Sequence, residues 1–278
     1  MVSFKKQVSK GSRFNQIYVP KELASKIEVG DEVEVRLLKK AVSLNYSYSI
    51  HKISPFKERI IKNIFSILQS IKSITNVCVV GSFLTKKIMY RDVDIVVITK
   101  EKNKGIEQKV YKRLLEDIEL NFHVISLSKQ ELDKLLSICP LTRMMFQTYI
   151  SNTPLDVKKN KRIDKKHIQF LLMMPIDLLT ITLESRVFYD ALRRLITIDV
   201  FLENKPMTTP KIHAQIEHII GERTTKLLQE NKLIDEAILK KLRIIMRKKI
   251  NSIRKDITHG ESKDSKSTNK TNGDSTAT

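Results

Sequence analysis

Three short apolar runs, separated by segments of helical periodicity, constrain the fold of this 278-residue chain more than any other feature. The runs are "NVCVV" at 76–80, "VDIVVI" at 93–98 and "NFHVISL" at 121–127, and each has the length of one β-strand. Apolar residues at helical spacing predict an amphipathic helix over 55–74 and a second one over 105–118. Strands that alternate with helices predict a layered α/β (α+β) domain.

Two aspartates, Asp92 and Asp94, accompany the second apolar run. Because they are two positions apart on an extended segment, their side chains are predicted to point from the same face. Two carboxylates that close raise each other's pKa unless a cation lies between them. A divalent metal is the natural cation, since Mg²⁺ or Mn²⁺ combines a few protein carboxylates with the oxygens of a triphosphate.

Gly81 and Ser82 form a turn directly after the first apolar run. Glycine permits close backbone approach, while the amides of a helix start and the Ser82 hydroxyl can hold phosphates. Lys86 and Lys87 follow by one helical turn, so they are either ligands of the triphosphate or solvated charges of a basic protein. The combination predicts metal-dependent nucleotidyl transfer with an NTP as substrate.

The pattern Gly-Ser-x9-Asp-x-Asp resembles the DNA polymerase β superfamily of nucleotidyltransferases, in particular its minimal branch. Four residues carry the resemblance, namely Gly81, Ser82, Asp92 and Asp94. The predicted order of helices and strands agrees with that family over about 56–127. The resemblance implies that the two aspartates bind the metal and that the Gly-Ser turn binds the nucleotide.

One feature departs from the family pattern. Members that catalyse transfer usually carry a third acidic residue on the next strand, and its expected position here is His123, or else Asn121. Glu119 has the right chemistry but stands near the start of that strand. His123 can serve as a general base or as a neutral metal ligand. Its presence equally fits a domain that binds nucleotide without turning it over.

The first forty residues contain two short alternating runs, "QIYV" and "EVEVRLL", around a one-turn helix at Pro20. A unit this small cannot bury its apolar face alone, so we expect it to pair with a second copy in a homodimer. Over 5–40, "YVPKEL" and "GDEVEV" resemble the AbrB/MazE-type swapped-hairpin family. The resemblance implies DNA binding by basic residues, for which the candidates are Lys6, Lys10, Arg13 and Lys21. The alternative is a dimerisation module whose lysines are only solvated.

The domain organisation follows from these patterns. We predict a swapped-hairpin module at 1–44, a nucleotidyltransferase domain at 55–150, an all-α domain at 165–260 and a disordered tail at 261–278. The basic final helix of the all-α domain is either an acceptor-binding surface for nucleic acid or a solvated helix face.

Charge and composition bound the partners. The net charge of +20 favours an acidic partner, and nucleic acid is the usual one. No apolar run approaches the length of a membrane span, no apolar signal sequence begins the chain, and only two cysteines occur. We therefore expect a cytoplasmic protein without a membrane partner.

Two functional hypotheses follow. The first is an Mg²⁺-dependent enzyme that transfers an NMP from an NTP to a nucleic-acid or protein acceptor, with a DNA-binding module at its start. The second is an AbrB-like DNA-binding regulator, or an antitoxin-type protein of a toxin–antitoxin pair. In that case the nucleotidyltransferase domain is degenerate or senses nucleotide.

Overall fold

The computed structural model divides the chain into two compact units, Met1–Ala41 and Val42–Thr278. It describes four stretches, which are residues 2–36, 41–50, 52–86 and 90–259. The predicted tail at 261–278 lies outside the described residues.

The first unit contains little regular structure. Strand β1 (Ser9–Lys10) pairs antiparallel with β2 (Asn15–Gln16), and a 3₁₀ turn, η1 (Lys21–Leu23), follows Pro20. None of its described residues is buried, and Phe14 is 78% exposed. The strand predicted around "EVEVRLL" is absent from 31–36, and its remaining residues lie outside the described part. Within the part of the chain that the structure describes, no strand pairs with this segment to supply the hydrogen bonds of a ladder.

The second unit is built on a five-stranded sheet in the order β3-β7-β4-β5-β6. Its strands are β3 (Asn45–Tyr46), β4 (Ile74–Val80), β5 (Val93–Thr99), β6 (Phe122–Ser128) and β7 (Tyr149–Ser151). All neighbours are antiparallel except β5 and β6, which are parallel. A parallel pair requires a crossover, and α2 (Ile106–Asp117) provides it.

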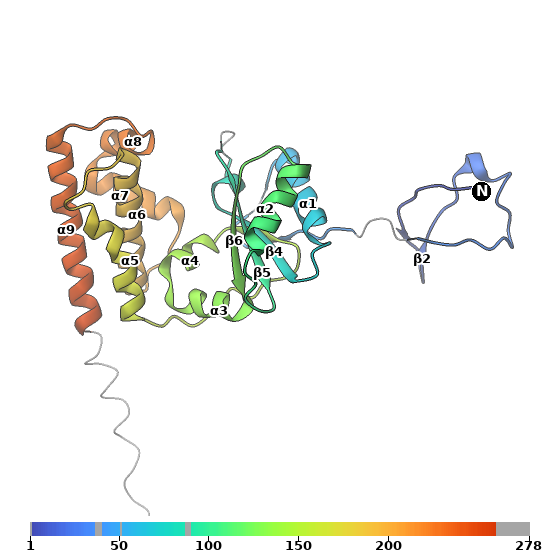
Figure 1. Ribbon diagram of the computed structural model, residues 1–278, viewed down its shortest axis with the longest axis horizontal. Helices are drawn as coiled ribbons and strands as arrows, with labels where there is room; N and C mark the ends of the chain where they lie inside the picture. The colour runs from blue at the N-terminus through green and yellow to red at the C-terminus, as the bar shows by residue number, and fades with distance from the viewer. Residues whose placement is uncertain (1, 37–40, 51, 87–89, 260–278) are drawn as a thin grey trace, which may run out of the picture. The chain divides into compact units, whose positions relative to one another are not determined.

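Helices cover both faces of this sheet (Figure 1). On one face, α1 (Pro55–Leu68) and α2 pack against alternate residues of β5, such as Val93 and Ile95. On the other face, α3 (Lys129–Ile138) packs against Val96 and Ile98. Helix α1 ends earlier than the predicted 55–74, because Ile74 already begins β4. A short helix, α4 (Pro140–Met145), follows α3.

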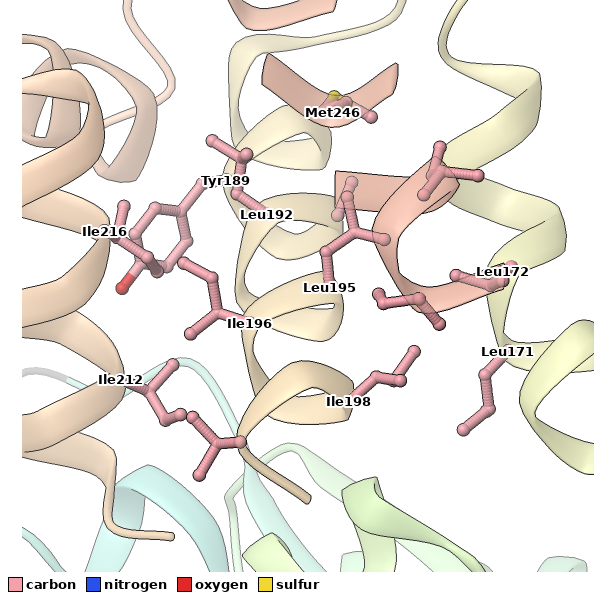
Figure 2. Close-up of a cluster of buried hydrophobic side chains, with 14 of the residues drawn as sticks. Leu171, Leu172, Tyr189, Leu192, Leu195, Ile196, Ile198, Ile212, Ile216 and Met246 are labelled. Atoms are coloured by element: carbon pink, nitrogen blue, oxygen red, sulfur yellow. The ribbon is translucent and has the colours of Figure 1, made fainter. Parts of the chain in front are cut away.

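The rest of the second unit is helical, as the sequence predicts. Its helices are α5 (Lys165–Asp177), α6 (Ser185–Leu202), α7 (Thr209–Ile220), α8 (Glu222–Gln229) and α9 (Glu236–His259). Figure 2 shows that apolar side chains of α5, α7 and α9 converge on α6. Pro175 lies inside α5, two residues before the end of that helix at Asp177. Among the described helices, none is long and apolar enough to cross a membrane.

Partly buried cations help to join these elements. Lys161, in the segment between β7 and α5, donates from Nζ to the Phe201 carbonyl at 2.7 Å and to the Leu202 carbonyl at 3.3 Å. These are carbonyls of the last turn of α6, and the Phe201 carbonyl also accepts from the Asn204 amide at 3.1 Å. Lys249 of α9 forms an ion pair with Asp199 of α6, a carboxylate that is largely buried.

Candidate functional site

The candidate site lies where β4 ends and β5 begins. The antiparallel register places Val80 opposite Asp94, so Gly81 leaves β4 directly beside the Asp94 carboxylate. A Cβ atom at Gly81 would lie 2.2 Å from Asp94 Oδ2, and Gly81 has a φ of +78°. The positive φ favours glycine here, and a Cβ atom would force the Asp94 carboxylate to move from its present position.

The alternation of β5 explains why Asp94 is accessible. Val93 and Ile95 point into the core under α1 and α2, so Asp94 lies on the face covered by α3. It precedes the apolar residues of that face, Val96 and Ile98, and its side chain is 29% exposed. Asp92 is partly buried and comes just before β5, which begins at Val93.

His123 is the partner of Asp94 on the next strand. Parallel pairing of β5 and β6 sets the two residues opposite each other, and His123 Nδ1 lies 3.1 Å from Asp94 Oδ1. One Asp94 oxygen thus faces the imidazole while the other lies beside Gly81. When Nδ1–H donates to Asp94, Nε2 is left as an acceptor for a proton or a metal ion.

The two other positions considered for a third acid lie apart from Asp94. Strand β6 begins at Phe122, so Glu119 lies in the exposed connection after α2 and not on the strand face. The Asn121 carbonyl accepts from the Val93 amide at 2.9 Å, which makes Asn121 part of the backbone framework. Glu119 and Asn121 line a shallow hollow of about 430 Å³ with Tyr90 and Arg91.

The phosphate-binding candidates follow Gly81 in the 3₁₀ turn η2 (Gly81–Leu84) and just beyond it. Ser82 is exposed, and its carbonyl accepts from the Thr85 amide at 3.0 Å and from the Thr85 hydroxyl at 2.7 Å. Lys86 is exposed, whereas Lys87 lies outside the described residues. Ser82 and Lys86 are therefore accessible, Ser82 within the turn that begins at Gly81 and Lys86 two residues after that turn ends.

Lys57 is a supporting residue that the sequence analysis missed. It is only 6% exposed, and its Nζ donates to the Thr85 carbonyl at 2.8 Å. The ammonium lies 5.3 Å from the ring centre of Phe83 and 5.6 Å from that of Tyr90. Burial lowers the pKa of Lys57. Through Thr85, Lys57 supports the turn that carries Ser82.

A signal for Lys57 is present in the sequence. It shares helical spacing with Ile60, Ile61 and Ile64, so it lies on the apolar face of α1. A lysine on such a face must find a partner inside the protein.

The donor set permits a metal site that substrate completes. Among the described residues, no three acidic, histidine or cysteine side chains converge on one point as a preformed metal site. Asp92 and Asp94 are the carboxylates of the site, and His123 contributes a nitrogen next to them. This set fits Mg²⁺ or Mn²⁺, which take few protein carboxylates and fill the remaining positions with phosphate oxygens and water.

The basic candidates of the first unit are all exposed. Lys6 precedes β1, Lys10 lies on β1, Arg13 is in the turn to β2, and Lys21 begins η1. Lys10 pairs with Asn15 in the short β1–β2 ladder, and Arg13 lies in the turn that joins these two strands.

A comparison with protein families bears on the segment that contains the candidate site. Residues 58–191 match the nucleotidyltransferase domain family. This segment is therefore similar to a nucleotidyltransferase domain of the DNA polymerase β superfamily, as its Gly-Ser and Asp-x-Asp pattern predicts. The matched range of the nucleotidyltransferase domain extends past the predicted 55–150, through α5 and into α6. Neither the curated proteins nor the solved structures give a significant match.

We predict that Gly81→Ala destabilises the nucleotidyltransferase domain more than Gly105→Ala does. The two glycines have nearly equal φ angles, +78° and +81°, but only at Gly81 would the new Cβ meet a neighbour within 4 Å. Backbone strain at either position costs about 1–2 kcal/mol, and displacement of Asp94 adds about 1–3 kcal/mol at Gly81. Denaturant unfolding of the two variants measures the difference, and equal losses of stability would contradict this account of the site.

Proposed function

We propose that the protein is an Mg²⁺- or Mn²⁺-dependent nucleotidyltransferase. It moves an NMP from an NTP to a hydroxyl of a nucleic-acid or protein acceptor. The observation that carries this proposal is the position of Asp94, which lies between Gly81 and His123 where β4 ends and β5 begins. The nucleotidyltransferase family match supports it independently.

Asp92 and Asp94 would hold the divalent ion. When bound, the ion neutralises the triphosphate and lowers the pKa of the attacking hydroxyl. Asp94 is suited to this role because it is partly exposed and because no side chain at Gly81 blocks its Oδ2.

The remaining residues bind the nucleotide and move the proton. Ser82 would donate its hydroxyl to a phosphate oxygen, with Lys86 and Lys87 supplying positive charge. The acceptor oxygen attacks the α-phosphorus, the bond to the β-phosphate oxygen breaks, and pyrophosphate leaves. His123 would take the hydroxyl proton at Nε2 while Asp94 holds its Nδ1–H, and Glu119 is the alternative assistant.

We further propose that the first unit is an AbrB-like swapped-hairpin module that forms a homodimer and binds DNA. The exposure of its apolar side chains supports a partner copy, because a unit of this size needs one to bury them. Lys6, Lys10, Arg13 and Lys21 would contact DNA phosphates and base edges.

The second candidate function is a DNA-binding regulator or antitoxin-type protein whose nucleotidyltransferase domain only senses nucleotide. The observation that favours it is a histidine, His123, opposite Asp94 where active members usually carry an acid. In that case the Asp94–His123 contact would serve binding without turnover.

A cytoplasmic location forms part of the proposal. Cys78 and Cys139 are free, buried thiols, as expected in a reducing compartment. Burial raises the pKa of Cys78 to about 12, so this thiol stays protonated and unreactive at neutral pH.

We predict that the wild-type protein transfers label from an α-³²P NTP and that Asp92→Asn/Asp94→Asn abolishes the transfer, by at least about 100-fold. The assay offers each of the four NTPs with Mg²⁺ or Mn²⁺ to RNA, DNA oligonucleotides and lysate proteins. Asp117→Asn, at an exposed position of α2, is the matched control and should retain full activity. Absence of transfer to every acceptor, together with tight DNA binding, would support the regulator instead.

We predict that the full chain is a dimer and that Val33→Lys/Val35→Lys yields monomers, because lysines at these positions would place charge in the shared apolar face. Light scattering after size exclusion measures the mass. Leu233→Lys is the control, since Leu233 is 97% exposed in the second unit and should leave the dimer intact. A monomeric wild-type chain would contradict the swapped-hairpin proposal.

A further inference from the structure

Pairs of basic residues recur every seven positions along α9. The pairs are Lys240–Lys241, Arg247–Lys248 and Arg254–Lys255. A step of seven residues returns to nearly the same side of a helix after a rise of about 10.5 Å. All six side chains are exposed, so they form one cationic stripe along the helix.

The opposite side of α9 is an apolar seam. Its buried residues are Leu242, Met246, Ile250, Ile253 and Ile257, which pack in the core around α6. Figure 2 shows Met246 directed into this core with Leu192 and Leu195 of α6. Because the seam is fixed against the protein, the dibasic pairs are held facing away from it.

The two other basic residues of α9 are used inside the protein. Arg243 donates to the carbonyls of Leu178 and Ile181, both at 3.1 Å, and to the Thr182 hydroxyl at 2.9 Å. Lys249 forms its ion pair with Asp199. The helix therefore separates structural cations from those of the stripe.

The stripe is poorly neutralised by the protein itself. Lys240 pairs with Glu236 at 3.1 Å, but none of the other five stripe cations has an acidic partner within the described residues. Some exposed cations on other helices are paired, as in Lys62–Glu58 of α1 and Lys129–Asp133 of α3. Five cations without acidic partners on one helix face repel one another and attract an extended polyanion.

The composition of the stripe favours nucleic acid over a lipid surface. On the same side, Ile244 and Asn251 lie between the dibasic pairs and Thr258 follows the last pair, so Ile244 is the one large apolar residue among these three. The apolar seam that an interfacial helix would use is already buried. Regularly spaced pairs of cations along a straight helix match a regularly charged phosphate backbone.

We infer that the dibasic stripe of α9 binds the phosphate backbone of nucleic acid. This inference deepens the proposed function, because it names nucleic acid as the acceptor of the nucleotidyl group. The statement that nucleic acid is the acceptor rests on the proposed function. The binding itself does not require transfer. Contacts with the backbone fix position and carry no sequence information, so the stripe should bind without sequence preference.

The test measures binding of labelled RNA, single-stranded DNA and duplex DNA by fluorescence anisotropy. One variant replaces all six stripe residues with glutamine, which has nearly the helix propensity of lysine. The control replaces six exposed lysines elsewhere in the second unit with glutamine, namely Lys72, Lys100, Lys104, Lys109, Lys112 and Lys211. Both sets are made in the full chain with Lys6, Lys10, Arg13 and Lys21 already changed to glutamine, so that the first unit does not mask the result.

The stripe variant should raise the Kd at least about tenfold at about 0.1 M salt and reduce the salt slope by about three or more. The control should stay within about twofold. Equal weakening by the two sets, or binding of anionic phospholipid vesicles in place of nucleic acid, would overturn the inference. If the sixfold variant fails to fold, the three double variants, one for each dibasic pair, should each weaken binding.

The same reagents separate this inference from the proposed function. Stripe-dependent binding by a wild-type protein that transfers no label would leave the inference standing and the transferase wrong. Label transfer only to protein, with nucleic-acid binding unaffected by the stripe variant, would leave the proposed transferase standing and overturn the inference about the stripe.

Discussion

The close approach of Gly81 to Asp94 is the contact on which the candidate site depends. It combines a glycine with positive φ at the end of β4 and a carboxylate on the facing position of β5. The rest of the arrangement follows from that register. Parallel pairing with β6 then brings His123 to the second carboxylate oxygen, and the turn after Gly81 exposes Ser82. Lys57 supports this turn through the hydrogen bond that its ammonium donates to the Thr85 carbonyl.

The parts predicted from sequence are those that local pattern determines. The runs at 76–80 and 93–98 are strands, and the spacing of the Gly-Ser and Asp-x-Asp residues is sufficient to predict the nucleotidyltransferase domain. From the sequence, the residue at the position of the third acid could be any of three, namely His123, Asn121 or Glu119. Strand register depends on where β6 begins, and Phe122 begins it three positions after Glu119. That long-range detail selects His123 and sets Glu119 apart.

The first unit and Lys57 show two further limits of prediction. Val33 and Val35 have the alternation of a strand, but a strand forms only where a partner completes its hydrogen bonds. Among the described residues no strand pairs with 31–36, and the Val33 and Val35 side chains are exposed. Lys57 was overlooked because lysine is usually a surface residue. Its position on the apolar face of α1 predicts that the lysine is buried and has a partner inside the protein.

The positive charge of the protein has at least three distinct physical uses. Lys161 and Lys249 satisfy carbonyl or carboxylate groups within the helical part. Lys57 supports the turn of the site, and the dibasic stripe of α9 faces solvent. Net charge alone therefore says little about where a polyanion binds. The regular seven-residue spacing of exposed basic pairs on α9 is the feature that points to a surface for a polyanion.

The central claim, that the Asp94 carboxylate holds a metal ion together with nucleotide, is tested most directly by Mn²⁺ binding. Electron paramagnetic resonance would follow free Mn²⁺ during titration with and without a non-hydrolysable NTP analogue. For the wild type and the exposed control Glu116→Gln, we expect the analogue to tighten Mn²⁺ binding beyond the affinity of the analogue alone. Asp94→Asn should weaken this ternary binding at least about tenfold. Equal Mn²⁺ affinity for the wild type and Asp94→Asn in the presence of the analogue would contradict the account.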